Sequence, residues 1–221
     1  MEQFFSRISA ARFLRWSIVF TLAVTAARLV GELRNWPRPW FDKFSGIIGI
    51  TWVLPPVFGF CFAWKLWNDG QRIVRIDRAV LLGVLGFALN ELVEPTVFQF
   101  ADISFRSMLL ILWAVAILSV YLQYLAWPAL CKRLVAYGLG ARIPVVVIMF
   151  FALRGHWGTH YDSPSGPISW NFWPTFLWFG LLEELIYWVS FTVAFGSLAG
   201  SLAAALAKWL LNRTETTPVP D

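Results

Sequence analysis

The sequence is poor in the side chains from which most catalytic and metal sites are built. Its 221 residues include two histidines and two cysteines, and it has no Cys-x-x-Cys pair. Two cysteines, Cys61 and Cys131, are too few for a disulfide framework and argue against dithiol redox chemistry. The histidines, His156 and His160, lie four residues apart on one segment, so they cannot approach one iron from opposite faces. A bis-histidine haem held within this chain is therefore excluded.

Charged residues are also scarce, at 14% of the chain, against about 25% in soluble domains. Hydrophobic residues make up 58%, and tryptophan, whose indole ring favours the level of lipid headgroups, occurs 14 times. The net charge of +5 does not indicate nucleic-acid binding, because the basic residues are scattered between apolar runs. This composition predicts an integral membrane protein that binds no nucleic acid and has the lipid bilayer as its surroundings.

The apolar runs predict an all-α membrane protein with about six transmembrane helices. We expect one polytopic domain over residues 1–211 and a polar tail, disordered and cytoplasmic, over 212–221. The spans are expected near residues 16–33, 46–67, from 79 onward, 107–130, 134–153 and 187–210.

Prolines predict two irregularities in this pattern. Pro55 and Pro56 are expected to kink or break the second span. The segment from Pro174 to Leu211 is longer than one span needs. We therefore expect a short interfacial or re-entrant helix, Pro174 to about Leu185, before the last span.

Gly196 and Gly200 form a Gly-x-x-x-Gly pattern in the last span. Small residues at this spacing let another helix approach closely. The pattern predicts tight helix packing. The helix face that carries these two glycines is also where a membrane-protein partner or a second copy of the chain would bind.

Basic residues indicate the orientation of the chain. With six spans, the segments on the N-terminal side hold twelve of the 18 Lys and Arg residues, and the opposite side holds six. Because cytoplasmic loops carry the excess of basic residues, we expect both termini to be cytoplasmic. Most of the carboxylates and both histidines then fall in the outer half.

Polar residues interrupt two of the spans. Arg28 and Glu32 are four residues apart and can pair on one helix face. Asn90, Glu91 and Glu94 lie in the far half of the third span, where ionisable groups are costly and indicate function. Arg28 and the Asn90–Glu94 group are candidates for a polar path, unless the third helix ends near residue 93 and both glutamates are in water.

The segment Gly155 to Asp162 holds both histidines. His156, His160 and Asp162 are candidate ligands of a divalent metal such as zinc. The alternative is a loop whose side chains bond each other and the backbone, because its glycines argue against a helix. Glu183 and Glu184, within an apolar run, are candidate catalytic residues.

Two partial resemblances to known enzyme motifs fail on inspection. Glu183-Glu184 resembles the paired glutamates of intramembrane prenyl-protein proteases, but Tyr187 stands where those enzymes have arginine, and no histidine follows. Ser163-Pro164-Ser165-Gly166 resembles part of the lipid-phosphate phosphatase motifs without their histidines. A rhomboid-type nucleophile, a P-loop and a dinucleotide fingerprint are absent from the sequence.

One segment carries a further resemblance. Arg142-Ile143-Pro144-Val145 through Gly158-Thr159-His160-Tyr161-Asp162 is similar to a segment of uncharacterised bacterial multi-pass membrane proteins. The resemblance implies a bacterial inner-membrane protein and carries no chemistry.

Two functional classes follow from these residues. The first is a small transport, channel or membrane-complex subunit with a polar cluster in its outer half. The second is a membrane-embedded, metal-dependent hydrolase with a site of histidines and carboxylates at the outer surface. We favour the first class, because the second requires a loop to supply exact ligand geometry.

Overall fold

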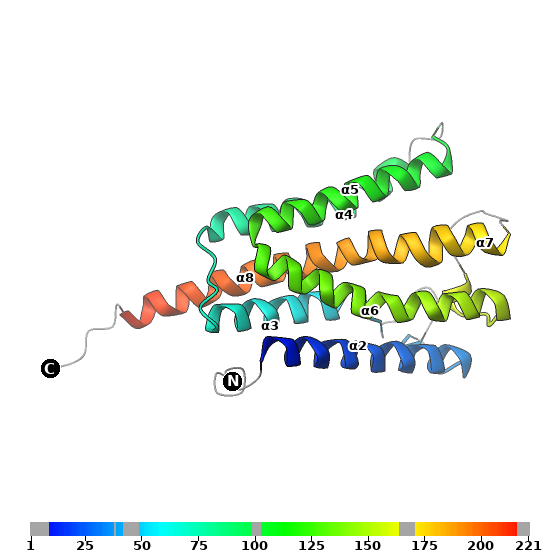
Figure 1. Ribbon diagram of the computed structural model, residues 1–221, viewed down its shortest axis with the longest axis horizontal. Coiled ribbons are helices and arrows are strands. Elements are labelled where there is room, and N and C mark those ends of the chain that lie inside the picture. Colours follow the sequence, from blue (N-terminus) through cyan, green and yellow to red (C-terminus); the bar gives the residue numbers. More distant parts are fainter. Residues whose placement is uncertain (1–8, 38, 42–48, 99–102, 164–170, 216–221) are drawn as a thin grey trace.

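The computed structural model describes residues 9–37, 39–41, 49–98, 103–163 and 171–215 (Figure 1). The regular structure in these ranges is entirely helical. The helices are α2 (Ala10–Leu33), α3 (Leu54–Asn68), α4 (Ile76–Phe98), α5 (Phe105–Ala126), α6 (Pro128–Gly155), the 3-10 turn η1 (His160–Asp162), α7 (Phe172–Thr175), the π-helix η2 (Phe176–Trp188) and α8 (Val189–Glu215). The all-α prediction is confirmed.

The long helices lie side by side and alternate in direction along the chain (Figure 1). Helix α2 begins, and α8 ends, at the same end of the bundle, which we call the near end. Helices α4 and α5 form one side, α2 forms the opposite side, and the continuous run of α7, η2 and α8 passes between them.

Four helical segments are long and apolar enough to cross a membrane: Ala10–Leu33, Phe105–Ala126, Pro128–Gly155 and Phe172–Leu210. These segments support the membrane prediction. Helix α3, with 15 residues, is shorter than the roughly 20 that a span needs. Helix α4 is long enough but carries four charged residues, Asp77, Arg78, Glu91 and Glu94.

The structure differs from the sequence prediction at the prolines and in the last helical segment. Pro55 and Pro56 occupy the first turn of α3 instead of kinking a longer helix, because the first backbone N–H groups of a helix have no partner in any case. Pro144 lies inside α6, which begins at Pro128, earlier than expected, and continues to Gly155. Residues 172–210 form one continuous helical run, so a separate re-entrant helix before residue 186 is not found.

The helices turn polar side chains inward and large apolar ones outward. The buried face of α2 carries Ser17, Thr21 and Thr25, whereas Trp16 and Phe20 are exposed. The three hydroxyls donate to backbone carbonyls four residues earlier. This arrangement suits a bundle surrounded by lipid, where small and hydroxyl-bearing residues mediate contacts between helices.

Helices α3 and α8 approach each other closely through glycines. A Cβ atom at Gly59 would overlap the backbone of Gly196, and one at Gly200 would meet Leu130 and Ala63. The Gly196/Gly200 face is therefore covered by α3 and α6 of the same chain. A partner binding through that face would have to displace α3.

Candidate functional site

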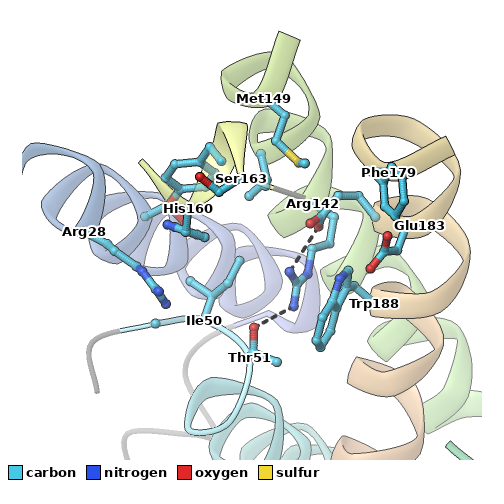
Figure 2. A pocket seen from close by; sticks show the side chains of 15 residues that line it. Arg28, Ile50, Thr51, Arg142, Met149, His160, Ser163, Phe179, Glu183 and Trp188 are labelled. Carbon is cyan, nitrogen blue, oxygen red and sulfur yellow. Dashed lines mark hydrogen bonds and ion pairs between the residues drawn. The ribbon is translucent and has the colours of Figure 1, made fainter. Parts of the chain in front are cut away.

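A polar pocket of about 180 Å³ opens between α2, α6, η1, η2 and the segment that precedes α3 (Figure 2). It lies in the half of the bundle remote from the near end. Its lining residues are Thr25, Arg28, Gly49, Ile50, Thr51, Arg142, Val145, Met149, His160, Tyr161, Ser163, Phe179, Glu183, Glu184 and Trp188. Charged and hydroxyl-bearing side chains therefore meet inside a bundle whose outer surface is apolar.

Arg142 occupies the centre of the pocket (Figure 2). Its Nη1 donates to Oε2 of Glu184 at 3.1 Å, and its Nη2 donates to Oγ1 of Thr51 at 3.2 Å. The guanidinium also lies 5.2 Å from the centroid of the Trp188 ring. The side chains of Arg142 and Glu184 are 5% and 10% exposed. This is a buried ion pair, held on three sides by a carboxylate, a hydroxyl and an aromatic face.

A second ion pair forms the neighbouring wall. Arg28 Nε donates to Oε1 of Glu32 at 2.9 Å, and the Glu32 side chain is fully buried. The backbone N–H of His160 donates to the other oxygen, Oε2, at 2.9 Å. The His160 Nδ1 atom lies 2.6 Å from Oε1, at ion-pair distance but with an angle outside hydrogen-bond limits. Glu32 therefore ties α2 to the turn η1.

Burial determines the charge state of the turn that covers the pocket. It lowers the pKa of His160, and this effect exceeds the opposing influence of Glu32. The same cause raises the pKa of Tyr161 above its usual range. Both rings, with centroids 3.8 Å apart, are therefore neutral at physiological pH.

The π-helix η2 brings two consecutive glutamates to the same pocket. Glu183 and Glu184 both line it, and η2 extends over 13 residues, Phe176–Trp188. Most π-helical segments are single turns and are frequent at functional sites. The sequence singled out both glutamates, but it did not indicate the wide helix that presents them.

The structure does not gather the three predicted metal ligands. Asp162 accepts bonds from the Gly158 and Thr159 backbone N–H groups and from Thr159 Oγ1, forming a capping box around η1. His156 is exposed and adopts φ 48° at the end of α6, and His160 faces Glu32. Among the described residues no group of three or more His, Cys, Asp or Glu is placed to hold a metal. The structure therefore gives the predicted metal site no support.

The residues of the predicted polar path are divided between two places. Arg28 lines the polar pocket, and Asn90 does not. Asn90 is buried, donates to Gly86 O and Ser119 Oγ, and accepts from Ser190 Oγ at 3.3 Å. Glu91 is half-buried, and the side chain of Glu94 lies outside the described part. Helix α4 continues past residue 93 to Phe98, so the alternative in which it ends there is wrong.

Sequence reasoning missed the central residue of the pocket. Arg142 is one of the twelve basic residues that the sequence assigned to the N-terminal side of the membrane, but it is 4% exposed and lies inside the bundle. An arginine in the middle of a long apolar helix was the signal that could have identified it. Thr51 carried no comparable signal.

Comparison of the chain with family models, with curated proteins and with solved structures finds no match in any of the three.

Proposed function

We propose that the chain is a multi-pass inner-membrane protein that binds a small acidic solute in the polar pocket and carries it across the bilayer. One observation supports this function above all others. Two ion pairs, Arg28–Glu32 and Arg142–Glu184, meet at a single pocket within helices that are otherwise apolar, and all of their residues except Glu32 line it. Desolvating such pairs costs several kcal/mol for each ion, and ionisable groups at membrane depth mark solute and ion pathways.

The size and chemistry of the pocket limit what it can bind. A volume of about 180 Å³ is below the 300–1,000 Å³ of sites for drug-sized ligands, so the solute has few heavy atoms. Guanidinium groups match the geometry of carboxylate and phosphate oxygens. A solute with such a group would bind Arg28 and Arg142, while their glutamate partners and the Thr51 hydroxyl hold the arginines in place.

The alternating directions of the long helices support six crossings, with α3 and α4 completing the bundle beside the four candidate spans. With Arg142 removed from the twelve basic residues on the N-terminal side, eleven remain against six on the other side. The excess still favours cytoplasmic termini. The polar pocket would then lie in the outer half of the membrane.

The test is uptake of radiolabelled acetate, succinate and inorganic phosphate into liposomes that contain the purified protein. The informative variant is Arg142→Lys, which keeps the charge and removes the planar fork that holds Glu184 and Thr51. Arg154→Lys is the matched control, because Arg154 lies on the same helix, is exposed and contacts only the rings of Phe150 and Phe172 in the described structure.

We expect saturable uptake of at least one of these anions, reduced about tenfold or more by Arg142→Lys, as for the loss of a bidentate contact. Arg154→Lys should match the wild type. A second variant, Gly49→Ala, probes Arg28, because a Cβ atom at Gly49 would lie 2.6 Å from Arg28 Nη1 and displace it. Absence of saturable uptake, or equal rates for wild type and Arg142→Lys, would overturn the proposal.

A further inference from the structure

A second cavity lies on the other side of η2. Helices α5 and α6 meet at Trp127 and diverge from there (Figure 1), and η2 with the start of α8 lies between them. The resulting α5–α6 groove has a volume of about 570 Å³. Its lining residues are Ile117, Val120, Tyr121 and Tyr124 on α5, Cys131, Lys132, Val135 and Leu139 on α6, and Leu185, Ile186, Val189 and Ser190 on the third wall. It shares no lining residue with the polar pocket.

The walls of the groove are mostly apolar. Val120, Val135, Leu139 and Ile186 supply aliphatic surface along its length. Near the α5–α6 connection stands Lys132, whose Nζ lies 5.9 Å from the ring centroid of Tyr124. Lys132 is exposed, and in the described part of the chain it has no carboxylate within ion-pair distance.

The aromatic residues place this end at the membrane surface. Tyr121 and Tyr124 are 56% and 42% exposed on the last two turns of α5, and Trp127 follows directly. Tyr and Trp concentrate at the level of the headgroups, and a lysine there extends its charge into the headgroup layer. The groove therefore has a cation at headgroup depth and an aliphatic channel that leads from it toward the centre of the bundle.

We propose that the α5–α6 groove binds an anionic phospholipid, with one acyl chain along Val135 and Leu139 and the phosphate at Lys132. Basic positions between transmembrane helices on the cytoplasmic side bind such headgroups. The volume suits a single ligand, whereas a helix with its side chains is about 10–12 Å wide. This site does not depend on the proposed solute transport, and only its place on the cytoplasmic side rests on the orientation proposed above.

The test is native mass spectrometry of the detergent-purified protein, titrated with phosphatidylglycerol and phosphatidylcholine of identical acyl chains. Lys132→Gln removes the charge at an exposed position. Its control is Lys208→Gln, an exposed lysine on α8 that does not line the groove. Val135→Trp fills the channel, and its control is Ile143→Trp, which adds the same bulk to an exposed position of α6 outside the groove.

We expect one phosphatidylglycerol to bind about fivefold more tightly than phosphatidylcholine, the effect of one lysine near an anionic headgroup. Lys132→Gln should abolish this preference and Lys208→Gln should keep it. Val135→Trp should weaken binding of both lipids, and Ile143→Trp should not. Equal affinity of the wild type for the two lipids would overturn the proposal. A preference for phosphatidylglycerol that Lys132→Gln leaves unchanged would also overturn the proposal. So would a Val135→Trp variant whose oligomeric state changes while its lipid binding stays the same.

Discussion

The buried ion pair between Arg142 and Glu184 provides the sharpest test of the energetics. Three variants form a double-mutant cycle: Arg142→Met, Glu184→Leu and the two combined. Removing one partner of a buried pair costs about 3–5 kcal/mol, because it leaves a charge without compensation. Replacing both with apolar residues of similar volume is often neutral or stabilising by about 1–4 kcal/mol. We therefore expect each single variant to unfold more easily than the double variant.

The structure also predicts that the two single variants differ. Arg142→Met leaves Glu184 without its ion-pair partner in a site where the carboxylate is 10% exposed. We expect the full cost of about 3–5 kcal/mol for this variant. Glu184→Leu leaves Arg142 bonded to Thr51 and placed over the Trp188 ring. A desolvated cation–π contact is worth about 2 kcal/mol, so this second loss should be smaller by about that amount.

The assay is reversible unfolding in mixed micelles of mild detergent and dodecyl sulfate, followed by circular dichroism. We expect a coupling free energy of about 3 kcal/mol or more between the two positions. Additive losses, with the double variant the least stable of the three, would refute it. The double variant also separates folding from function, since it should be stable but inactive in the uptake assay.

Two further predictions use the same unfolding assay. Gly59→Ala should destabilise the bundle by about 1–3 kcal/mol as an overpacked contact, because its Cβ would overlap the Gly196 backbone. Gly83→Ala is the control, because its Cβ would lie 3.2 Å from Leu198 Cα, and it should lower the free energy of unfolding by less than Gly59→Ala does. An equal or larger loss for Gly83→Ala would show that the α3–α8 contact is not tight. The second concerns pH: burial lowers the His160 pKa from its ordinary value of 6.5, so the unfolded chain takes up the proton first as pH falls. The stabilisation of the folded state by neutral His160 is complete above about pH 6.5 and is lost as pH falls through the folded-state pKa. The free energy of unfolding of the wild type, relative to that of His160→Gln, should therefore decline between pH 7 and 5. A difference that does not change with pH would contradict a buried neutral imidazole.

The sequence was sufficient for the class of fold and for most helix positions. The first helix was expected to end near Leu33 and does so, because the apolar run stops there. The interfacial or re-entrant helix predicted from Pro174 to about Leu185 is not confirmed, because residues 172–210 form one continuous helical run. A span-length argument sets the minimum length for crossing a membrane, but it does not stop a helix from continuing when no proline or glycine breaks it.

Local patterns in the sequence predicted only one of the contacts that form the polar pocket. The i, i+4 spacing predicted the Arg28–Glu32 pair, and this contact is confirmed at 2.9 Å. The other contacts join residues far apart in sequence: 42 positions separate Arg142 from Glu184, and 128 separate Glu32 from His160. No periodicity within one helix specifies which helices become neighbours.

One of the predicted metal ligands, Asp162, belongs to a local capping pattern that the sequence also contains. Thr159 and Asp162 are spaced as in a capping box, a pattern in which each side chain bonds the backbone of the other residue. That signal was present in the same residues from which the metal ligands were chosen. Because both Asp162 oxygens are engaged by the turn, the local pattern should have taken precedence over the i, i+4 spacing of the histidines.

One readable pattern does lead to the pocket. Five polar residues follow one another along α2 at intervals of three or four positions: Ser17, Thr21, Thr25, Arg28 and Glu32. They therefore share one helix face. The first three make local backbone bonds, and Thr21 also bonds Tyr137 on α6 at 2.8 Å; Thr25 and Arg28 then reach the pocket lining. In a membrane helix such a polar stripe must face the bundle interior, because lipid offers it no partner. The stripe therefore predicts the buried face of α2. At its charged end Arg28 and Glu32 pair with each other, and Glu32 also accepts from the His160 backbone N–H of η1.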